Sequence, residues 1–186
     1  MSKKFLIRYS IVLWLIAILI DAVNNLFPSN ISQVAMIVVP FLGTFAMISI
    51  YLLQRKQVGL FGVIALTVDM IGSGLLPIAH MANAFVYPHV PEDVAMSLLT
   101  GALNSAIMVG LYIFILGVVL ESIAVLIAKV FSPIPAVLLI LAYLPYLFLS
   151  VVPSWVIMVG TILGQVAVIW LSVQLWQKSG EEEFAT

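Results

Sequence analysis

The sequence contains no cysteine, and only 8% of its 186 residues are charged. Without thiols, disulfides, thiolate nucleophiles, iron–sulfur clusters and cysteine-based zinc sites are all excluded. Soluble globular domains carry roughly 25% charged residues, so a soluble fold is excluded as well. The few basic residues are scattered and the net charge is −1, which leaves no electrostatic footprint for nucleic acid.

Apolar residues make up 64% of the chain and gather into long segments separated by polar or proline-bearing stretches. A helix that spans a bilayer needs about 20 such residues. The expected spans are 5–26, 31–53, 58–76, 99–128, 134–152 and 155–175. The sequence therefore predicts an all-α, polytopic membrane helical bundle with six transmembrane helices. Its single domain covers residues 1–178, and an acidic cytoplasmic tail follows at 179–186.

The basic residues favour one orientation in the membrane, because lysine and arginine near the ends of spans collect on the cytoplasmic side. With the N-terminus in the cytoplasm, every basic residue of the six-span plan falls on that side. These residues are Lys3, Lys4, Arg8, Arg55, Lys56, Lys129 and Lys178. We therefore expect a multi-pass membrane protein with both termini in the cytoplasm.

Three places along the spans are expected to be irregular. Pro91, followed by two acids, is a strong helix start, but a helix from there through the fourth span would exceed the bilayer. We expect a short surface helix and a break near Gly101. Residues 77–88 are too few to cross and are either interfacial or re-entrant. Pro40 and Pro145 lie inside spans two and five and should kink them.

Asp21 is the first of three acids placed within or at the end of a span, where a charge costs about 2.5–3.5 kcal/mol. Asn24 and Asn25 follow three and four residues later and share its helical face, and Trp14 lies on the same stripe. These residues form either the polar end of a binding site or a solvated turn at the headgroup level.

Asp69 lies on a stripe of small residues that includes Gly62, Ala65 and Gly72. Small residues allow helix backbones to approach closely, so this acid should face the inside of the bundle. There it must be protonated or paired, and a structural hydrogen bond to a neighbour is the alternative to a functional role. Glu121 also lies on a small-residue stripe, nearer the cytoplasm, and acts either as a proton relay or as a locally paired acid.

The histidines, His80 and His89, belong to the external stretch after the third span, near the ends of the helices that carry Asp21 and Asp69. An external cluster is therefore predicted, with His80 and the two aspartates as catalytic residues. The ligand-binding candidates are Trp14, Asn24, Asn25 and Asn104. The alternative for each histidine is an interfacial loop residue.

A metal site is not predicted, since neither a His-x-x-x-His nor a Glu-x-x-His spacing occurs. No cofactor is expected. The lipid bilayer is the expected partner, and homo-oligomerisation is left open.

Three functions fit these residues, and the sequence does not decide whether the protein is an enzyme. The first is binding of an amphipathic or isoprenoid-like small molecule, with acid–base chemistry at Asp69 and Asp21. The second is a proton- or cation-coupled transporter or channel subunit, in which Asp69 and Glu121 are successive stations. The third is a non-catalytic subunit of a membrane complex, whose acids pair with another chain.

Overall fold

The computed structural model describes residues 3–149 and 151–181. Within these residues every regular element is helical. The long and medium helices are α1 (Lys3–Leu26), α3 (Val39–Leu75), α5 (Glu92–Thr100), α6 (Ala102–Ala128), α7 (Pro133–Tyr143) and α8 (Ser154–Glu181). Shorter elements are α2 (Asn30–Met36), α4 (Pro77–Met81), the π turn η1 (Ala82–Val86), and the 3₁₀ segments η2 (Tyr87–His89) and η3 (Leu144–Phe148).

Among the described residues, four helical runs are long and apolar enough to cross a membrane. They are Lys3–Leu26, Asn30–His89, Ala102–Ala128 and Ser154–Gly180. The all-α fold expected from the sequence is thus confirmed, and the described residues include long apolar helices that are able to span a membrane. The fifth predicted span corresponds to the shorter apolar run Pro133–Phe148.

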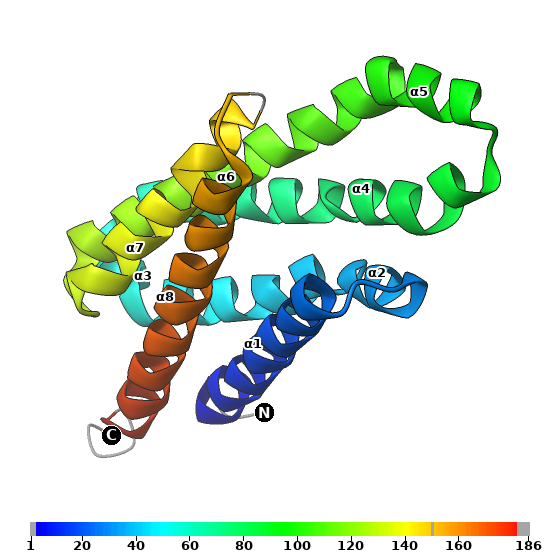
Figure 1. Cartoon of the computed structure of the whole chain (residues 1–186). Coiled ribbons are helices and arrows are strands. Elements are labelled where there is room, and N and C mark those ends of the chain that lie inside the picture. The colour runs from blue at the N-terminus through cyan, green and yellow to red at the C-terminus, as the bar shows by residue number, and fades with distance from the viewer. Residues whose placement is uncertain (1–2, 150, 182–186) are drawn as a thin grey trace.

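The second of these runs folds back on itself within α3. Gly59 has φ 51° and ψ −133°, which is not a helical conformation. Figure 1 shows the two halves of α3 running in opposite directions from this turn. The turn falls just after the polar stretch 54–57, where the sequence suggested a break. The helix continues through that stretch because its polar residues are compatible with a helix, whereas a positive φ is reached at low cost only by glycine.

Prolines and glycines interrupt the helices where the sequence predicted. Pro40 occupies the first turn of α3, after α2 has ended at Met36. α7 gives way to the 3₁₀ segment η3 at Leu144, because Pro145 lacks the amide hydrogen that an α-helix needs. α5 ends at Thr100, Gly101 has an extended backbone, and α6 begins at the next residue.

The stretch after the third predicted span is helical. α4, η1 and η2 follow α3 almost without interruption, and Figure 1 shows α4 continuing in the direction of the second half of α3. His80 is therefore carried on the same rod as Asp69, about three turns further along.

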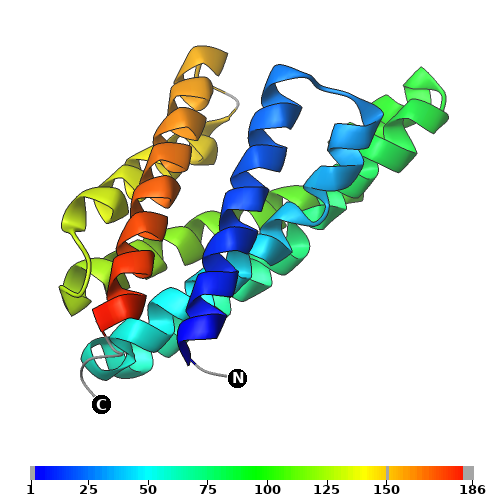
Figure 2. The ribbon, with the colours of Figure 1, turned by 90° about the horizontal axis from the view of Figure 1, so that it is seen from below.

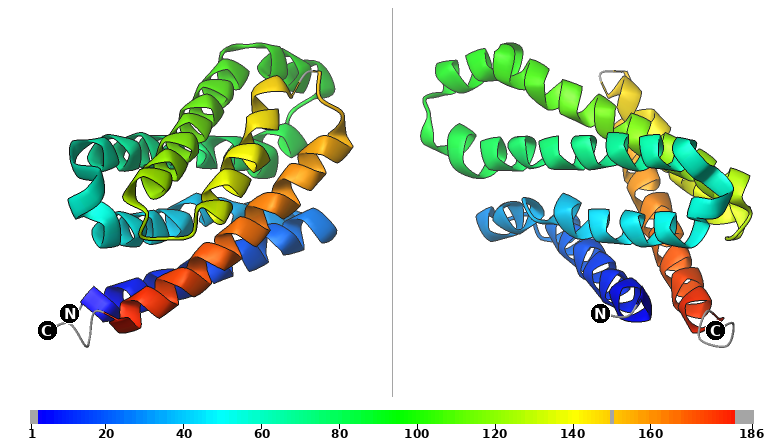
Figure 3. Two further views of the ribbon diagram at one scale, coloured as in Figure 1. Left: turned by 90° about the vertical axis from the view of Figure 1, so that its left-hand side faces the viewer. Right: turned by 180° about the vertical axis from the view of Figure 1, so that it is seen from behind.

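The ends of the helices gather at two opposite ends of the molecule. In Figures 2 and 3 both termini lie at one end, and the turn within α3 and the α6–α7 connection lie toward that same end. The segments that carry all seven basic residues are thus found together. These are the start of α1, the α3 turn, the residue after α6 and the last turn of α8.

The outside of the bundle is apolar. Leu19, Ile31, Leu60 and Val151 expose 63–84% of their surface, and many other large aliphatic and aromatic side chains point outward. Soluble monomers rarely expose continuous apolar surface on this scale. A lipid environment accounts for it, since outward-facing apolar side chains then contact hydrocarbon.

Glycines allow α3 and α6 to pack with their backbones nearly in contact. A Cβ atom added to Gly72 would lie 2.3 Å from Phe114 Cα, and one added to Gly117 would lie 2.4 Å from Asp69 Cα. The small-residue stripes predicted around Asp69 and Glu121 therefore meet each other. This contact fixes the position of Asp69 in the interior.

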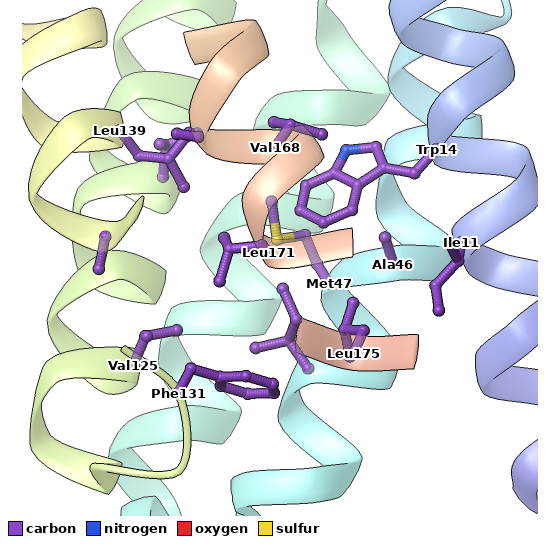
Figure 4. Packing of buried hydrophobic residues seen from close by; sticks show 14 of the residues in the cluster. Ile11, Trp14, Ala46, Met47, Val125, Phe131, Leu139, Val168, Leu171 and Leu175 are labelled. Carbon is purple, nitrogen blue, oxygen red and sulfur yellow. The ribbon is translucent and has the colours of Figure 1, made fainter. Parts of the chain in front are cut away.

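The hydrophobic core lies among α1, α3, α6, α7 and α8. Figure 4 shows Leu171 and Leu175 of α8 beside Met47 and Ala46 of α3, with Trp14 of α1 above them. This packing closes the half of the bundle nearer the termini.

Candidate functional site

A cavity of about 460 Å³ occupies the half of the bundle away from the termini. Residues from α1, α2, α3, α4, α6, α7, η3 and α8 line it, so every predicted span contributes. Most of the lining is aliphatic or aromatic. The polar lining residues include Asp21, Asn25, Asp69, Ser73, His80 and Gln165. Pockets of 300–1,000 Å³ with apolar walls and a few polar groups are typical of small-molecule sites.

The floor of the cavity is the upper surface of the hydrophobic core. Five residues belong to both: Trp14, Met47, Val118, Leu139 and Val168. Figure 4 shows the indole of Trp14 lying toward Met47 and Val168. Trp14 is only 5% exposed, so its ring forms a fixed wall. The expectation that Trp14 lies on the same side as Asp21 agrees with this geometry.

Asp21 is held by a residue from the far end of the chain. Gln165 Nε2 of α8 donates a hydrogen bond of 2.7 Å to Asp21 Oδ2. Asp21 is half-buried and lies in the last two turns of α1. The bond joins the carboxyl to α8, and Asp21 is one of the residues that line the cavity.

Asp69 is almost completely buried, at 1% exposure. The Ser73 side chain, one turn later on the same helix, lies close enough to interact with its carboxyl. Its Oδ1 atom is buried and has no hydrogen-bond partner among the described residues. Asp69 is also a lining residue of the cavity, so this unpaired oxygen belongs to a side chain at the cavity wall.

His80 also carries a ring nitrogen without a protein partner. Its Nδ1 atom is buried and lacks a hydrogen-bond partner among the described residues, and Asp21 lies near enough to interact with the imidazole electrostatically. Asn25 lines the mouth of the cavity and is otherwise exposed. The structure thus brings together Asp21, Asp69 and His80 as the sequence predicted, though their roles stay predictions.

Three other predicted residues do not line the cavity. Asn24 Oδ1 accepts a hydrogen bond of 2.9 Å from Ser32 Oγ and ties α1 to α2. Asn104 lies one turn before Ile107, the first α6 residue of the lining. Glu121 is 4% exposed and lies one turn beyond Gly117, on the side of the core. Its Oε1 atom has no hydrogen-bond partner among the described residues.

Sequence reasoning missed the aromatic hydroxyls and the α8 residues of the site. Tyr146 and Thr161 share a hydrogen bond of 2.7 Å across the η3–α8 contact. The rings of Tyr143 and Phe114 meet edge to face with centroids 5.4 Å apart. The available signal was the Gly160-x-x-x-Gly164 pattern, which marks a close helix contact beside Thr161 and Gln165.

Metal binding has no evident location in the described part of the chain. No group of three or more histidine, aspartate or glutamate side chains converges there in a way that could hold an ion.

Replacement of Gln165 by leucine should destabilise the protein by about 1–3 kcal/mol, because the partly buried carboxyl of Asp21 then loses its hydrogen-bond donor. Chemical unfolding in mixed micelles measures the free energy. In the Asp21→Asn background the same replacement should cost less than half as much. Equal costs in both backgrounds would show that the Asp21–Gln165 bond contributes nothing specific.

Comparison of the chain with protein-family models, with curated proteins and with solved structures gave no match.

Proposed function

We propose that this multi-pass membrane protein binds an amphipathic, isoprenoid-like small molecule in the cavity, with acid–base chemistry at Asp69 and Asp21. The observation that carries the proposal is the meeting of two carboxyls and an imidazole at one apolar cavity. Asp69 Oδ1 and His80 Nδ1 are both buried there without partners among the described residues. A ligand with a small polar group and an apolar body matches such a lining.

The proposed topology has six crossings, with both termini in the cytoplasm. The turn at Gly59 divides the run Asn30–His89 into two antiparallel rods. An 11-residue α7 at about 1.5 Å per residue, extended by a five-residue 3₁₀ segment at about 2 Å per residue, reaches about 26 Å. That length is close to the roughly 30 Å hydrocarbon thickness. The grouping of the basic residues at one end supports the cytoplasmic assignment of that end.

The proposed chemistry is a proton shift on an alkene. Asp69, in its protonated form, donates its proton to one alkene carbon, and the Asp21 carboxylate removes a proton from the carbon next to the cation. The double bond moves, the substrate keeps its composition, and no electrons are gained or lost. Water is scarce in an apolar cavity, which protects the cationic intermediate from hydration.

The cavity favours binding over the relay that was the second hypothesis. Asp69 belongs to the lining and Glu121 does not. Glu121 lies one turn along α6 from Gly117, which packs against the Asp69 backbone, and the two acids are near enough to interact electrostatically. A relay through these two acids would need a polar path, whereas the described neighbours of Glu121 on α6 are mostly apolar and small.

Farnesol, an isoprenoid alcohol, should bind to the purified protein and quench tryptophan fluorescence, because Trp14 forms the floor of the cavity. Gly43→Leu should weaken this binding about 10-fold or more. The leucine side chain takes space that the ligand would occupy, and the ligand then loses the burial of about two methylene groups. Gly43 lines the cavity and has only ordinary contacts with Trp14, at 3.8 Å, so a side chain there projects into the empty space.

Gly74→Leu is the matched control, because Gly74 lies on the same helix with no atom within 4 Å of an added Cβ. It should bind farnesol as the wild type does. The binding proposal is contradicted if saturating farnesol leaves the fluorescence unchanged, or if both leucine variants bind equally well.

A further inference from the structure

The ionisable side chains that line the cavity are mainly acidic. The described lining includes two carboxyl groups, Asp21 and Asp69, and no lysine or arginine, so the imidazole of His80 is its one basic group. All seven lysine and arginine side chains of the chain lie on segments at the opposite end of the molecule. A positive charge is therefore favoured in this cavity over a negative one.

Asp21 is a half-buried carboxyl group whose hydrogen-bond donor is neutral. Gln165 Nε2 donates to its Oδ2 atom at 2.7 Å. A carboxylate can accept at about four positions, so this bond leaves room for a further partner. The amide supplies a dipole but no charge, whereas a carboxylate removed from water is best compensated by an opposite charge. A cationic group in the cavity would supply that charge.

His80 does not neutralise Asp21 through its buried ring nitrogen. The two side chains are near enough to interact electrostatically. The Nδ1 atom of His80, however, makes no hydrogen bond among the described residues. The imidazole therefore leaves the carboxyl group available to a ligand.

Three aromatic side chains form a connected row in the cavity wall. The rings of Phe114 and Tyr143 have centroids 5.4 Å apart, and those of Tyr143 and Tyr146 have centroids 5.9 Å apart. Asp21 is near enough to both tyrosines to interact with them electrostatically. Aromatic faces are electron-rich and attract cations, most strongly where water is excluded. The aromatic row and the Asp21 carboxyl thus favour the same kind of ligand group.

The hydroxyl group of Tyr146 is already used within the protein. Thr161 donates its hydroxyl hydrogen to Ile157 O at 3.1 Å, so Tyr146 is the donor in the 2.7 Å bond between Tyr146 and Thr161. The bond holds the ring of Tyr146 in place and withholds its hydrogen from a ligand. An anion needs such donors, whereas a cation needs only the ring surface.

We infer that the cavity selects amphipathic organic cations, with an ammonium group between the Asp21 carboxylate and the aromatic row and an apolar tail against Trp14. This ligand class deepens the proposed function, on which it rests, because the cation formed by proton transfer to an alkene would be stabilised by the same groups. A quaternary ammonium suits the site best, since aromatic rings recognise it and it has no hydrogen that requires an acceptor.

Farnesyltrimethylammonium, farnesol and farnesoate share one isoprenoid chain and differ in the charge of the headgroup. Each is titrated against the purified full chain in a non-ionic detergent at pH 7, with tryptophan quenching as the readout. The Kd of the ammonium should be about 10-fold or more below that of farnesol, as a desolvated cation–π contact allows. Farnesoate should bind about 10-fold or more weakly than farnesol, because its carboxylate meets a like charge.

Asp21→Asn tests the carboxylate through the ratio of the farnesol Kd to the ammonium Kd. The ratio should fall to about 2–5, which is what the aromatic contacts supply without the carboxylate. Asp93→Asn, which removes an acid from the exposed helix α5, should keep the wild-type ratio. Gly43→Leu should weaken binding of the ammonium as it weakens binding of farnesol, because both ligands occupy one cavity.

The wild-type comparison decides the inference even if Asp21→Asn does not fold. Equal affinity for the ammonium and farnesol would refute cation selection and leave the proposed binding of farnesol standing. An ammonium that binds where farnesol does not would support cation selection and contradict the proposed neutral ligand. Ammonium binding that Gly43→Leu leaves intact would put the cation outside the cavity, and an unchanged ratio in Asp21→Asn would exclude Asp21 as its counter-ion. Either of these last two results overturns the inference.

Discussion

Gly72→Ala is expected to unfold or severely destabilise the protein, by about 3 kcal/mol or more. The added Cβ would lie 2.3 Å from Phe114 Cα and 2.4 Å from Phe114 N, which are backbone atoms that no rotamer change can move. The helices must separate along the seam that also holds Asp69 against Gly117. Overpacking of a rigid contact costs roughly 1–3 kcal/mol even where side chains can adjust. The free energy of unfolding in mixed micelles measures the effect.

Gly74→Ala is the matched control, two residues further along the same helix. No atom lies within 4 Å of its added Cβ, so the substitution creates no clash. It should be neutral or stabilise the helix by up to about 0.5–1 kcal/mol, since alanine loses less backbone entropy than glycine. If both alanine variants change stability by the same amount, close packing of α3 on α6 is not what requires glycine at residue 72.

Asp69→Asn should lower the proposed proton shift at least about 100-fold, because an amide cannot donate a proton as a carboxylic acid can. Wild-type protein incubated with farnesol in D₂O should place deuterium on carbon. Re-extraction into ordinary water removes the label from the hydroxyl, so mass spectrometry reports carbon-bound deuterium alone. Asp21→Asn should cause a similar loss, since the proton acceptor is removed.

Asparagine is nearly the size of aspartate, so Asp69→Asn should still bind farnesol and quench Trp14 within a few-fold of the wild type. Asp93→Asn, on the exposed helix α5, should react like the wild type. A wild-type protein that binds farnesol but incorporates no deuterium would refute the chemistry and leave binding intact. Unchanged deuterium incorporation by Asp69→Asn would remove that residue from the reaction.

The features that could be predicted are those that the sequence of a single helix determines. Asp69 could be placed in the interior because the small residues on its own face require a close neighbour. Trp14 and Asn25 could be grouped with Asp21 because helical spacing sets them on one side. His80 could be placed near Asp69 because the two residues are close together in the sequence. In each case the information lies within a few turns of one segment.

The features that could not be predicted depend on which helices pack against each other. Gln165 is 144 residues from Asp21, and one glutamine in an apolar helix does not indicate its partner. Asn104 has the right face but lies one turn beyond the end of the cavity. Glu121 lies on the small-residue face by which α6 packs against α3. It lies further along that face than the cavity extends, so it does not line the cavity. Position along a span, as well as face, decides which polar residues share a site.

The change from α-helix to 3₁₀ geometry at Leu144 makes one wall of the cavity different from the rest. Pro145 removes an amide donor, and the 3₁₀ hydrogen bonds of this segment have poorer geometry than those of the neighbouring α-helices. Tyr146, which lines the cavity, is tied to α8 by its hydrogen bond with Thr161. If the proposed ligand enters sideways from the bilayer, we expect this short segment to move while the long helices remain packed.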